Sequence, residues 1–309
     1  MNKITVIGAG HVGSSVCFSL LEQNIADEIA LIDLNENLVK GQVKDLKDCA
    51  FITYEDKMVK IGTYDDVRDS SFVVITAGLS QPLSAKEGRT AGLSKCVSII
   101  KSIMAEITKR DYKGFIIVAS NPLDVMTYYA YKLSGLDKRQ VIGTGTLLDS
   151  TRLRIILADK LEVRVEDVEA MSLGEHGNTQ FMLLSKARIK GVSLSEYLSR
   201  EDIDAKQFEA TVNNDLRRYG FEILNEKGST YYGVAGAVSK IIKTIVNDEK
   251  KILPVSVYLN NKYGITDTYI SVPAVLGKDG AEKIDEITMT DEEKKQLQDS
   301  ALFIKSNIL

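Results

Sequence analysis

The sequence is poor in several residue types that often mark a function. It contains no tryptophan, two histidines, four prolines and three cysteines among 309 residues. The cysteines, Cys17, Cys49 and Cys96, are odd in number and lack the spacing of metal ligands, which argues against a disulfide framework and against a zinc site. We expect them to be reduced and mostly structural thiols, and we expect no bound metal.

Charge of one sign and long apolar runs are missing as well. The net charge is -4 with acidic and basic residues interspersed, so the chain offers no basic stripe for nucleic acid and no polybasic membrane anchor. No apolar stretch is long enough to cross a bilayer, and residues 4–7 resemble a buried strand rather than part of a signal peptide. We therefore expect a cytoplasmic protein that binds neither nucleic acid nor membranes.

The first half of the chain alternates β-branched runs with stretches of helical apolar spacing. This alternation is typical of a parallel sheet covered by crossover helices, and six strands would match a doubly wound nucleotide-binding sheet. The expected strands are residues 3–7, 28–32, 58–61, 72–76, 115–119 and 140–142. The expected helices are residues 12–23, 35–50, 93–110 and 123–133.

The second half of the chain has a different pattern. Its expected elements are helices at 202–224, 234–247 and 291–304 and strands at 252–259 and 269–276. A length of 309 residues and a hydrophobic content of 44% allow more than one core. We therefore predict an α/β protein of two domains, with a Rossmann-type doubly wound parallel sheet in residues 1–145 and a smaller α+β domain in residues 146–309.

A glycine-rich fingerprint follows the first expected strand. Gly8 permits a tight turn, Gly10 lets the backbone approach a pyrophosphate, and Gly13 lets the following helix pack closely on the sheet. Asp33 stands at the end of the next apolar run, where its carboxylate would bind the adenosine ribose and repel a 2′-phosphate. The spacing therefore favours NAD over NADP. We expect His11, within the fingerprint, to face solvent from a loop and to take no part in catalysis.

His176 is the other histidine, and glycines on both sides of the Glu175-His176 pair argue for an exposed loop. An imidazole suits proton transfer near neutral pH, Asp149 could hold it in one tautomer, and Arg152 could bind an anionic substrate by two parallel hydrogen bonds. Asp149 could equally be a helix N-cap, and Arg152 could be an ordinary surface arginine. Together the three residues suggest reversible carbonyl reduction on a carboxylated substrate.

Several motifs along the chain point in the same direction. They are Gly8 to Gly13, Ser120-Asn121-Pro122, Gly143 to Asp149, Arg152 and Gly174 to Asn178. This set resembles the L-2-hydroxy acid dehydrogenases of the lactate/malate dehydrogenase superfamily, over essentially the whole chain. Residues 220–235 are most similar to L-2-hydroxyisocaproate dehydrogenases, with L-lactate dehydrogenases close behind. The resemblance implies an NAD-dependent enzyme that interconverts a 2-oxo acid and an L-2-hydroxy acid.

The resemblance implies a role for each candidate residue. His176 would donate a proton to the 2-oxo oxygen as a hydride arrives from NADH, Asp149 would orient the imidazole, and Arg152 would bind the substrate carboxylate. Asn121 would contact the nicotinamide ribose and the substrate oxygen, although an Asn-Pro pair also forms turns. Thr230 would stand beside the substrate, although a threonine near a helix start often caps the helix.

Residues 78–89 correspond to the loop that closes over the substrate in this superfamily. Arg89 matches the arginine that polarises the carbonyl, and Gln81 matches the substrate-selecting position that is arginine in malate dehydrogenases, which disfavours malate. Gln81 and Arg89 are eight residues apart, two more than is usual. With Ser229 in place of the usual tyrosine, the longer loop predicts that bulky 2-oxo acids such as 2-oxoisocaproate are accepted. The alternative is an L-lactate dehydrogenase that reduces pyruvate.

The resemblance also implies a homodimer or homotetramer, and it raises the question of regulation. Lactate dehydrogenases activated by fructose 1,6-bisphosphate bind it through a basic pair that corresponds to Arg154 and Glu169. An acid at the second position should repel the phosphates, so we expect no such activation. A module that binds NAD without turnover is a remote alternative, disfavoured because a sensor would not need His176, Asp149 and Arg152.

Overall fold

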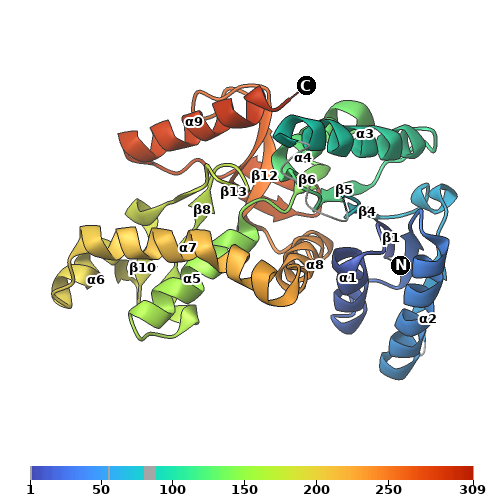
Figure 1. The fold of residues 1–309 in the computed structure, drawn as a ribbon, viewed down its shortest axis with the longest axis horizontal. Helices are drawn as coiled ribbons and strands as arrows, with labels where there is room; N and C mark the ends of the chain where they lie inside the picture. The colour runs from blue at the N-terminus through green and yellow to red at the C-terminus, as the bar shows by residue number, and fades with distance from the viewer. Residues whose placement is uncertain (1, 55, 80–87, 309) are drawn as a thin grey trace.

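One large sheet runs through the molecule and carries both halves of the chain. The computed structural model describes residues 2–54, 56–79 and 88–308, without the side chains of residues 88–91. Within these residues the sheet has nine strands in the order β14-β13-β12-β6-β5-β4-β1-β2-β3 (Figure 1). Two much smaller sheets lie in the second half of the chain.

Six parallel strands form the part of the sheet that the sequence predicted. They are β1 (Lys3–Ile7), β2 (Glu28–Ile32), β3 (Met58–Ile61), β4 (Phe72–Ile75), β5 (Phe115–Val118) and β6 (Val141–Gly143). Every residue of β1 and β4 is buried, as expected for central strands covered on both faces. The strand order 3-2-1-4-5-6 is that of a doubly wound dinucleotide-binding sheet, so the predicted fold class is confirmed.

Helices cover both faces of this sheet. They include α1 (His11–Glu22), α2 (Glu36–Thr53), α3 (Gly88–Thr108) and α4 (Leu123–Ser134). Figure 1 shows α3 and α4 on one face and α1 on the other, beside α8 (Tyr232–Val246) from the second half. Local sequence sets the ends: the Asn35 side chain accepts the Leu38 N–H at the start of α2, and Gly135 ends α4 in the left-handed conformation.

The second half adds helices around a second apolar core. Short 3-10 turns lie at Tyr64–Val67 in the first half and at Val165–Asp167 and Leu184–Lys186 in the second. Helix α9 (Asp291–Ser306) packs on the core of the large sheet instead, through Leu297 and Ile304. Helices α5 (Leu147–Lys160), α6 (Leu194–Arg200) and α7 (Ala205–Lys227) surround the second core. Leu153 and Leu157 of α5 and Leu216 of α7 are buried in this core. Helix α7 begins later than predicted because Asp204 caps it, accepting the Gln207 N–H.

Short strands in the second half were not predicted. They are β7 (Val168–Glu169), β8 (Ser172–Leu173), β9 (Phe181–Met182), β10 (Arg188–Ile189) and β11 (Val192–Ser193). Two residues are too few to show a period of two in the sequence, so pattern analysis cannot find them. They matter here because β8 leads directly into the loop that holds His176.

The largest departure from expectation concerns the last strands. β12 (Lys251–Leu259), β13 (Thr268–Gly277) and β14 (Gly280–Ile284) do not form a sheet of their own, because β12 pairs with β6 through Ser256 and Gly143. The backbones come close at Gly145, where an added Cβ would lie 2.5 Å from the backbone nitrogen of Ser256. The two halves therefore share one hydrogen-bonded sheet. None of the described helices is long and apolar enough to cross a membrane.

Candidate active site

His176 and Asp149 form the centre of the site. The Nδ1 atom of His176 lies 2.6 Å from the Oδ2 atom of Asp149. Asp149 stands in the first turn of α5 and is buried, while the His176 side chain is 25% exposed. Thr146, not Asp149, occupies the N-cap position of α5, so the alternative of Asp149 as a helix cap is wrong. The contact leaves the opposite ring nitrogen of His176 for a substrate.

Charges and burial shift both pKa values of this pair. Burial on its own would lower the pKa of His176, but the negative charges of Asp149 and Asp124 raise it above its ordinary value. Burial on its own would raise the pKa of Asp149, but the charge and hydrogen bond of His176, together with Arg152, hold it below its ordinary value. The pair therefore favours a protonated imidazole beside an ionised carboxylate, which is a proton donor ready for a carbonyl oxygen.

Asp124 is a second carboxylate behind His176, and the sequence analysis missed it. Its Oδ2 atom accepts the backbone N–H of His176 at 2.8 Å, and its Oδ1 atom accepts the Ser256 hydroxyl at 2.5 Å. Burial raises the pKa of Asp124 to about 6. Its position in the sequence could have identified it as a candidate, because Asp124 lies three residues after Asn121, in the first turn of a helix that follows a central strand. Asp124 joins the loop of Asn121 to the loop of His176.

Arg152 lies one helical turn from Asp149 and is mostly buried. Its Nη1 atom is 3.5 Å from the Oδ1 atom of Asp149, and its side chain is only 12% exposed. The guanidinium lies over the Tyr219 ring at 5.6 Å, and an added Cβ at Gly220 would come within 3.2 Å of it. The alternative of an ordinary surface arginine is therefore wrong. Arg154 faces elsewhere, and its Nη2 atom donates to the Val165 carbonyl.

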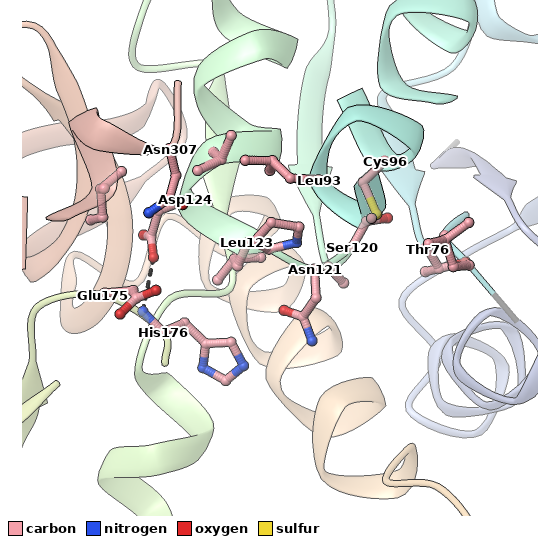
Figure 2. Close-up of a pocket in the computed structure, with 17 residues that line it drawn as sticks. Thr76, Leu93, Cys96, Ser120, Asn121, Leu123, Asp124, Glu175, His176 and Asn307 are labelled. Atoms are coloured by element: carbon pink, nitrogen blue, oxygen red, sulfur yellow. Dashed lines mark hydrogen bonds between the residues drawn. The ribbon is translucent and has the colours of Figure 1, made fainter. Parts of the chain in front are cut away.

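A cavity of about 570 Å³ opens beside the His176–Asp149 pair, at the carboxyl ends of β4 and β5. That edge is where ligands bind in doubly wound sheets. Asn121 and His176 both line the cavity, and in Figure 2 their side chains point to the same side of it. Apolar atoms of Leu93 and Leu123 line another part. Among the described residues, Arg152 and Thr230 are not part of this lining.

The glycine fingerprint forms a cradle that suits a dinucleotide. An added Cβ at Gly13 would lie 1.8 Å from the Gly8 carbonyl oxygen, and Gly8 itself has a φ of +112°. Gly10 is the N-cap of α1, has open space around its Cα, and receives no cap from any side chain that the structure describes. The first N–H groups of α1 are thus available for a pyrophosphate.

Asp33 holds the fingerprint loop in place. Its Oδ2 atom accepts the Ala9 N–H at 2.6 Å, and its Oδ1 atom accepts the Asn35 N–H at 2.8 Å. A carboxylate has lone pairs left for ribose hydroxyls after two such bonds. His11 does not stand in a loop, as the sequence suggested, but begins α1, where it is exposed and stacks on the Tyr231 ring. Helix α1 starts one residue earlier than its apolar spacing indicated.

The structure describes the remaining predicted residues only in part. Gln81 lies outside the described residues. Arg89 falls in the first turn of α3, and its side chain is not among those described. Ser229 and Thr230 are half-buried between α7 and α8, and Tyr231, not Thr230, is the N-cap of α8. The capping alternative for Thr230 is therefore wrong, and its role beside the substrate stays a prediction.

The three cysteines are free thiols, and one of them lines the cavity. Cys17, Cys49 and Cys96 are free, and burial raises the pKa of the Cys17 thiol to about 12. Cys96 lies against the cavity, and burial raises its pKa as well. In residues 2–54, 56–79 and 88–308, no three histidine, cysteine or acidic side chains gather as a metal site would require.

Known proteins resemble the chain over its whole length. Residues 2–143 match the family model described as lactate/malate dehydrogenase, NAD binding domain, and residues 146–309 match lactate/malate dehydrogenase, alpha/beta C-terminal domain. The L-lactate dehydrogenase of Lacticaseibacillus casei is 39% identical, covering 98% of this chain and 92% of its own. L-lactate dehydrogenase 1 of Enterococcus faecalis is also 39% identical, covering 99% and 93%.

Solved structures agree with these relatives. The minor L-lactate dehydrogenase of Enterococcus mundtii, in its ligand-bound form, has a TM-score of 0.94 and 32% identity, covering 99% of this chain and 97% of its own. Its ligand-free form has a TM-score of 0.90. A lactate dehydrogenase from a Medee basin deep-sea metagenome library has a TM-score of 0.94 and 34% identity, covering 99% and 98%.

Proposed function

Because this chain belongs to the lactate/malate dehydrogenase family and is an NAD-dependent dehydrogenase, we propose that it is an L-lactate dehydrogenase that reversibly reduces pyruvate. The observation that carries the proposal is the contact of His176 with the buried Asp149 at the edge of the cavity. The names of the similar proteins support pyruvate as the substrate. This choice reverses the order of the sequence-based expectation, which placed bulky 2-oxo acids first.

The mechanism assigns the proton to His176. When bound, NADH supplies the hydride that reduces the carbonyl carbon. The Nδ1–H group of His176 donates to Asp149, so the proton on its other nitrogen is presented to the substrate oxygen. Asp149 also stabilises the positive charge of the imidazole before that proton leaves. In lactate oxidation His176 takes the proton back.

The other residues bind and orient the substrate. Arg152 is held in a defined direction by Asp149 and the Tyr219 ring, and its guanidinium would bind the substrate carboxylate through two parallel hydrogen bonds. Asn121 would bind the substrate oxygen from the opposite loop. We keep Arg89, Gln81 and Thr230 as the proposed residues for carbonyl polarisation, substrate selection and substrate contact.

The nucleotide is proposed to bind across the edge of the parallel strands. Gly8, Gly10 and Gly13 would receive its pyrophosphate, and Asp33 its adenosine ribose. Residues 1–145 would form the NAD-binding domain, and residues 146–309 the catalytic domain. A homodimer or homotetramer in the cytoplasm, which binds only small molecules, stays the prediction for the whole protein.

A substrate panel tests the proposal. NADH oxidation is measured with pyruvate, 2-oxoisocaproate, phenylpyruvate and oxaloacetate, at fixed enzyme and without effectors. We expect the highest kcat/KM with pyruvate. A preference for 2-oxoisocaproate or phenylpyruvate would instead support the bulky-substrate hypothesis that rests on the loop length and Ser229.

A single variant separates an enzyme from a silent NAD-binding module. His176→Asn should abolish turnover, because it removes the proton donor, and should leave NADH binding within about twofold. Because the chain has no tryptophan, the fluorescence of the nucleotide itself must report binding. Unchanged turnover in this variant would refute the mechanism, and absent turnover in the unaltered protein with all four acids would refute the function.

A further inference from the structure

His11, which the proposed reaction leaves unused, connects the two binding regions. Its ring stacks on Tyr231, with ring centroids 5.1 Å apart and an angle of 24° between the planes. His11 is the first residue of α1, directly after Gly10 of the nucleotide cradle. Tyr231 directly follows Thr230, the residue proposed to contact the substrate, and is the N-cap of α8. The stack therefore joins the first turn of the cofactor helix to the substrate segment.

Tyr231 is held in position by further contacts. The Nζ atom of Lys227 lies 3.6 Å from the centroid of its ring and 4.0 Å from that of Tyr232. The two tyrosine rings meet edge to face at 4.5 Å. Cation-π and aromatic contacts of this kind restrict the ring of Tyr231 and define the surface on which His11 stacks.

The helices behind these residues pack against each other. Helix α1 packs along α8, as Figure 1 shows, and the Ser239 hydroxyl donates to the Ser19 hydroxyl at 2.9 Å. Their N-terminal ends meet through His11 and Tyr231. A side-chain contact therefore joins the two N-terminal ends, in addition to the packing along the helix bodies.

We propose that the His11–Tyr231 stack is a positioning contact, through which a dinucleotide bound at the start of α1 orders Thr230 for the substrate. The inference rests on the proposed function for the identity of the substrate. A nucleotide phosphate at the N-terminus of α1 restricts the first residue of that helix, which is His11. The ordered imidazole in turn restricts Tyr231 and the neighbouring backbone, so less freedom is lost when the substrate arrives.

The main test compares two replacements of His11 at saturating NADH. His11→Ala removes the ring and should raise the pyruvate KM about 3- to 10-fold, the range that one aromatic pair supports. We expect kcat and the NADH dissociation constant to stay within twofold. His11→Phe restores a ring and should return the KM to within twofold of the original. A loss of NADH affinity in both variants would mean that His11 acts on the nucleotide directly, which would overturn the proposal.

A double-mutant comparison tests the partner. Tyr231→Leu should raise the KM by a similar factor, and adding it to His11→Ala should produce little further change, because both remove one contact. Tyr54→Leu is the matched control: its ring also lies under a lysine, Lys57, at 5.6 Å, but it stands at the C-terminal end of α2, so its effect should multiply with that of His11→Ala. If the effects of Tyr231→Leu and His11→Ala multiply instead, the stack is not the coupling contact.

Hydrogen exchange tests the inference without turnover. NADH should slow amide exchange in residues 229–233 of the unaltered protein and should no longer do so in His11→Ala. Equal slowing in both proteins would refute the coupling. This result is decisive even if the unaltered protein fails to reduce pyruvate, in which case only the proposed function is lost.

Discussion

His176 stands between two carboxylates whose ionisation is shifted in opposite directions. Asp149 contacts the ring and has a lowered pKa, whereas Asp124 binds the backbone of the same residue and has a pKa raised to about 6. The first keeps a negative charge beside the imidazole across the physiological range. The second is fully buried and holds the loop that carries the ring. Opposite shifts of neighbouring acids are typical of sites that transfer protons.

The first prediction concerns Asp149. The pKa of His176 is raised, so pyruvate reduction, which needs the protonated imidazole, is at full rate at low pH and falls as pH rises through that value. Asp149→Asn removes the stabilising charge, so the falling limb of kcat/KM should move to lower pH, and kcat should fall about 100-fold or more. Asp159→Asn, exposed on the same helix, is the control and should leave the profile in place. A limb that does not move would contradict the assignment.

The second prediction concerns the stability contribution of Asp124. A folded-state pKa of about 6 against an ordinary 3.8 means that the folded protein binds this proton more tightly than the unfolded chain does. The contribution of Asp124 to the free energy of unfolding is therefore greatest at low pH and falls by about 3 kcal/mol as pH rises through the window from 3.8 to 6.

Denaturant unfolding at several pH values tests this contribution. The difference in unfolding free energy between Asp124→Asn and the unaltered protein should shift in favour of the variant as pH rises from 4 to 7, because the amide carries no charge to bury. A difference that is the same at both ends of this range would show that Asp124 titrates as an ordinary exposed acid.

At the scale of elements, the start of α1 packs very closely on the loop that precedes it. Gly13→Ala would place a Cβ 1.8 Å from the Gly8 carbonyl oxygen, a backbone atom that cannot move without displacing the cradle. We expect a loss of about 1–3 kcal/mol of stability or more, with weaker NADH binding. Gly41→Ala in α2 is the matched control, since nothing lies within 4 Å of its added Cβ. It should stabilise the protein by about 0.5–1 kcal/mol.

Calorimetry and nucleotide fluorescence measure these two effects. If Gly13→Ala proved as stable as Gly41→Ala and bound NADH normally, the close approach of α1 to the loop would not be a constraint on the fold.

The elements that could be predicted are those with a local signal. Strands β1 to β6 were placed to within one residue, because β-branched runs between turn residues identify buried parallel strands. The pairing of β12 with β6 could not be predicted, because Ser256 and Gly143 are far apart in the sequence and no local pattern records their contact. Likewise His176, Asp149 and Arg152 lie in recognisable motifs, whereas the contacts of Asp124 and Tyr231 arise only in the folded chain.

At the scale of the whole molecule, the surface around Arg154 bears on regulation. Arg154 donates to the Val165 carbonyl, and Glu169 is exposed on β7. A bisphosphate bound at these two residues would meet the negative charge of Glu169, where lactate dehydrogenases activated by fructose 1,6-bisphosphate would have a basic group. We expect millimolar fructose 1,6-bisphosphate to change the pyruvate KM by less than twofold. A steep fall in KM on adding it, measured by NADH oxidation, would disprove this.

The pairing of β6 with β12 has a consequence for how the chain can be divided. A fragment of residues 1–145 would keep the nucleotide fingerprint but would leave the N–H and C=O groups of β6 bare at a sheet edge, where other chains can add strands. We expect that fragment to aggregate, and the intact chain to unfold in a single transition by calorimetry and circular dichroism. The proposed boundary between the NAD-binding and catalytic domains thus crosses a continuous sheet, and we expect neither half to fold on its own.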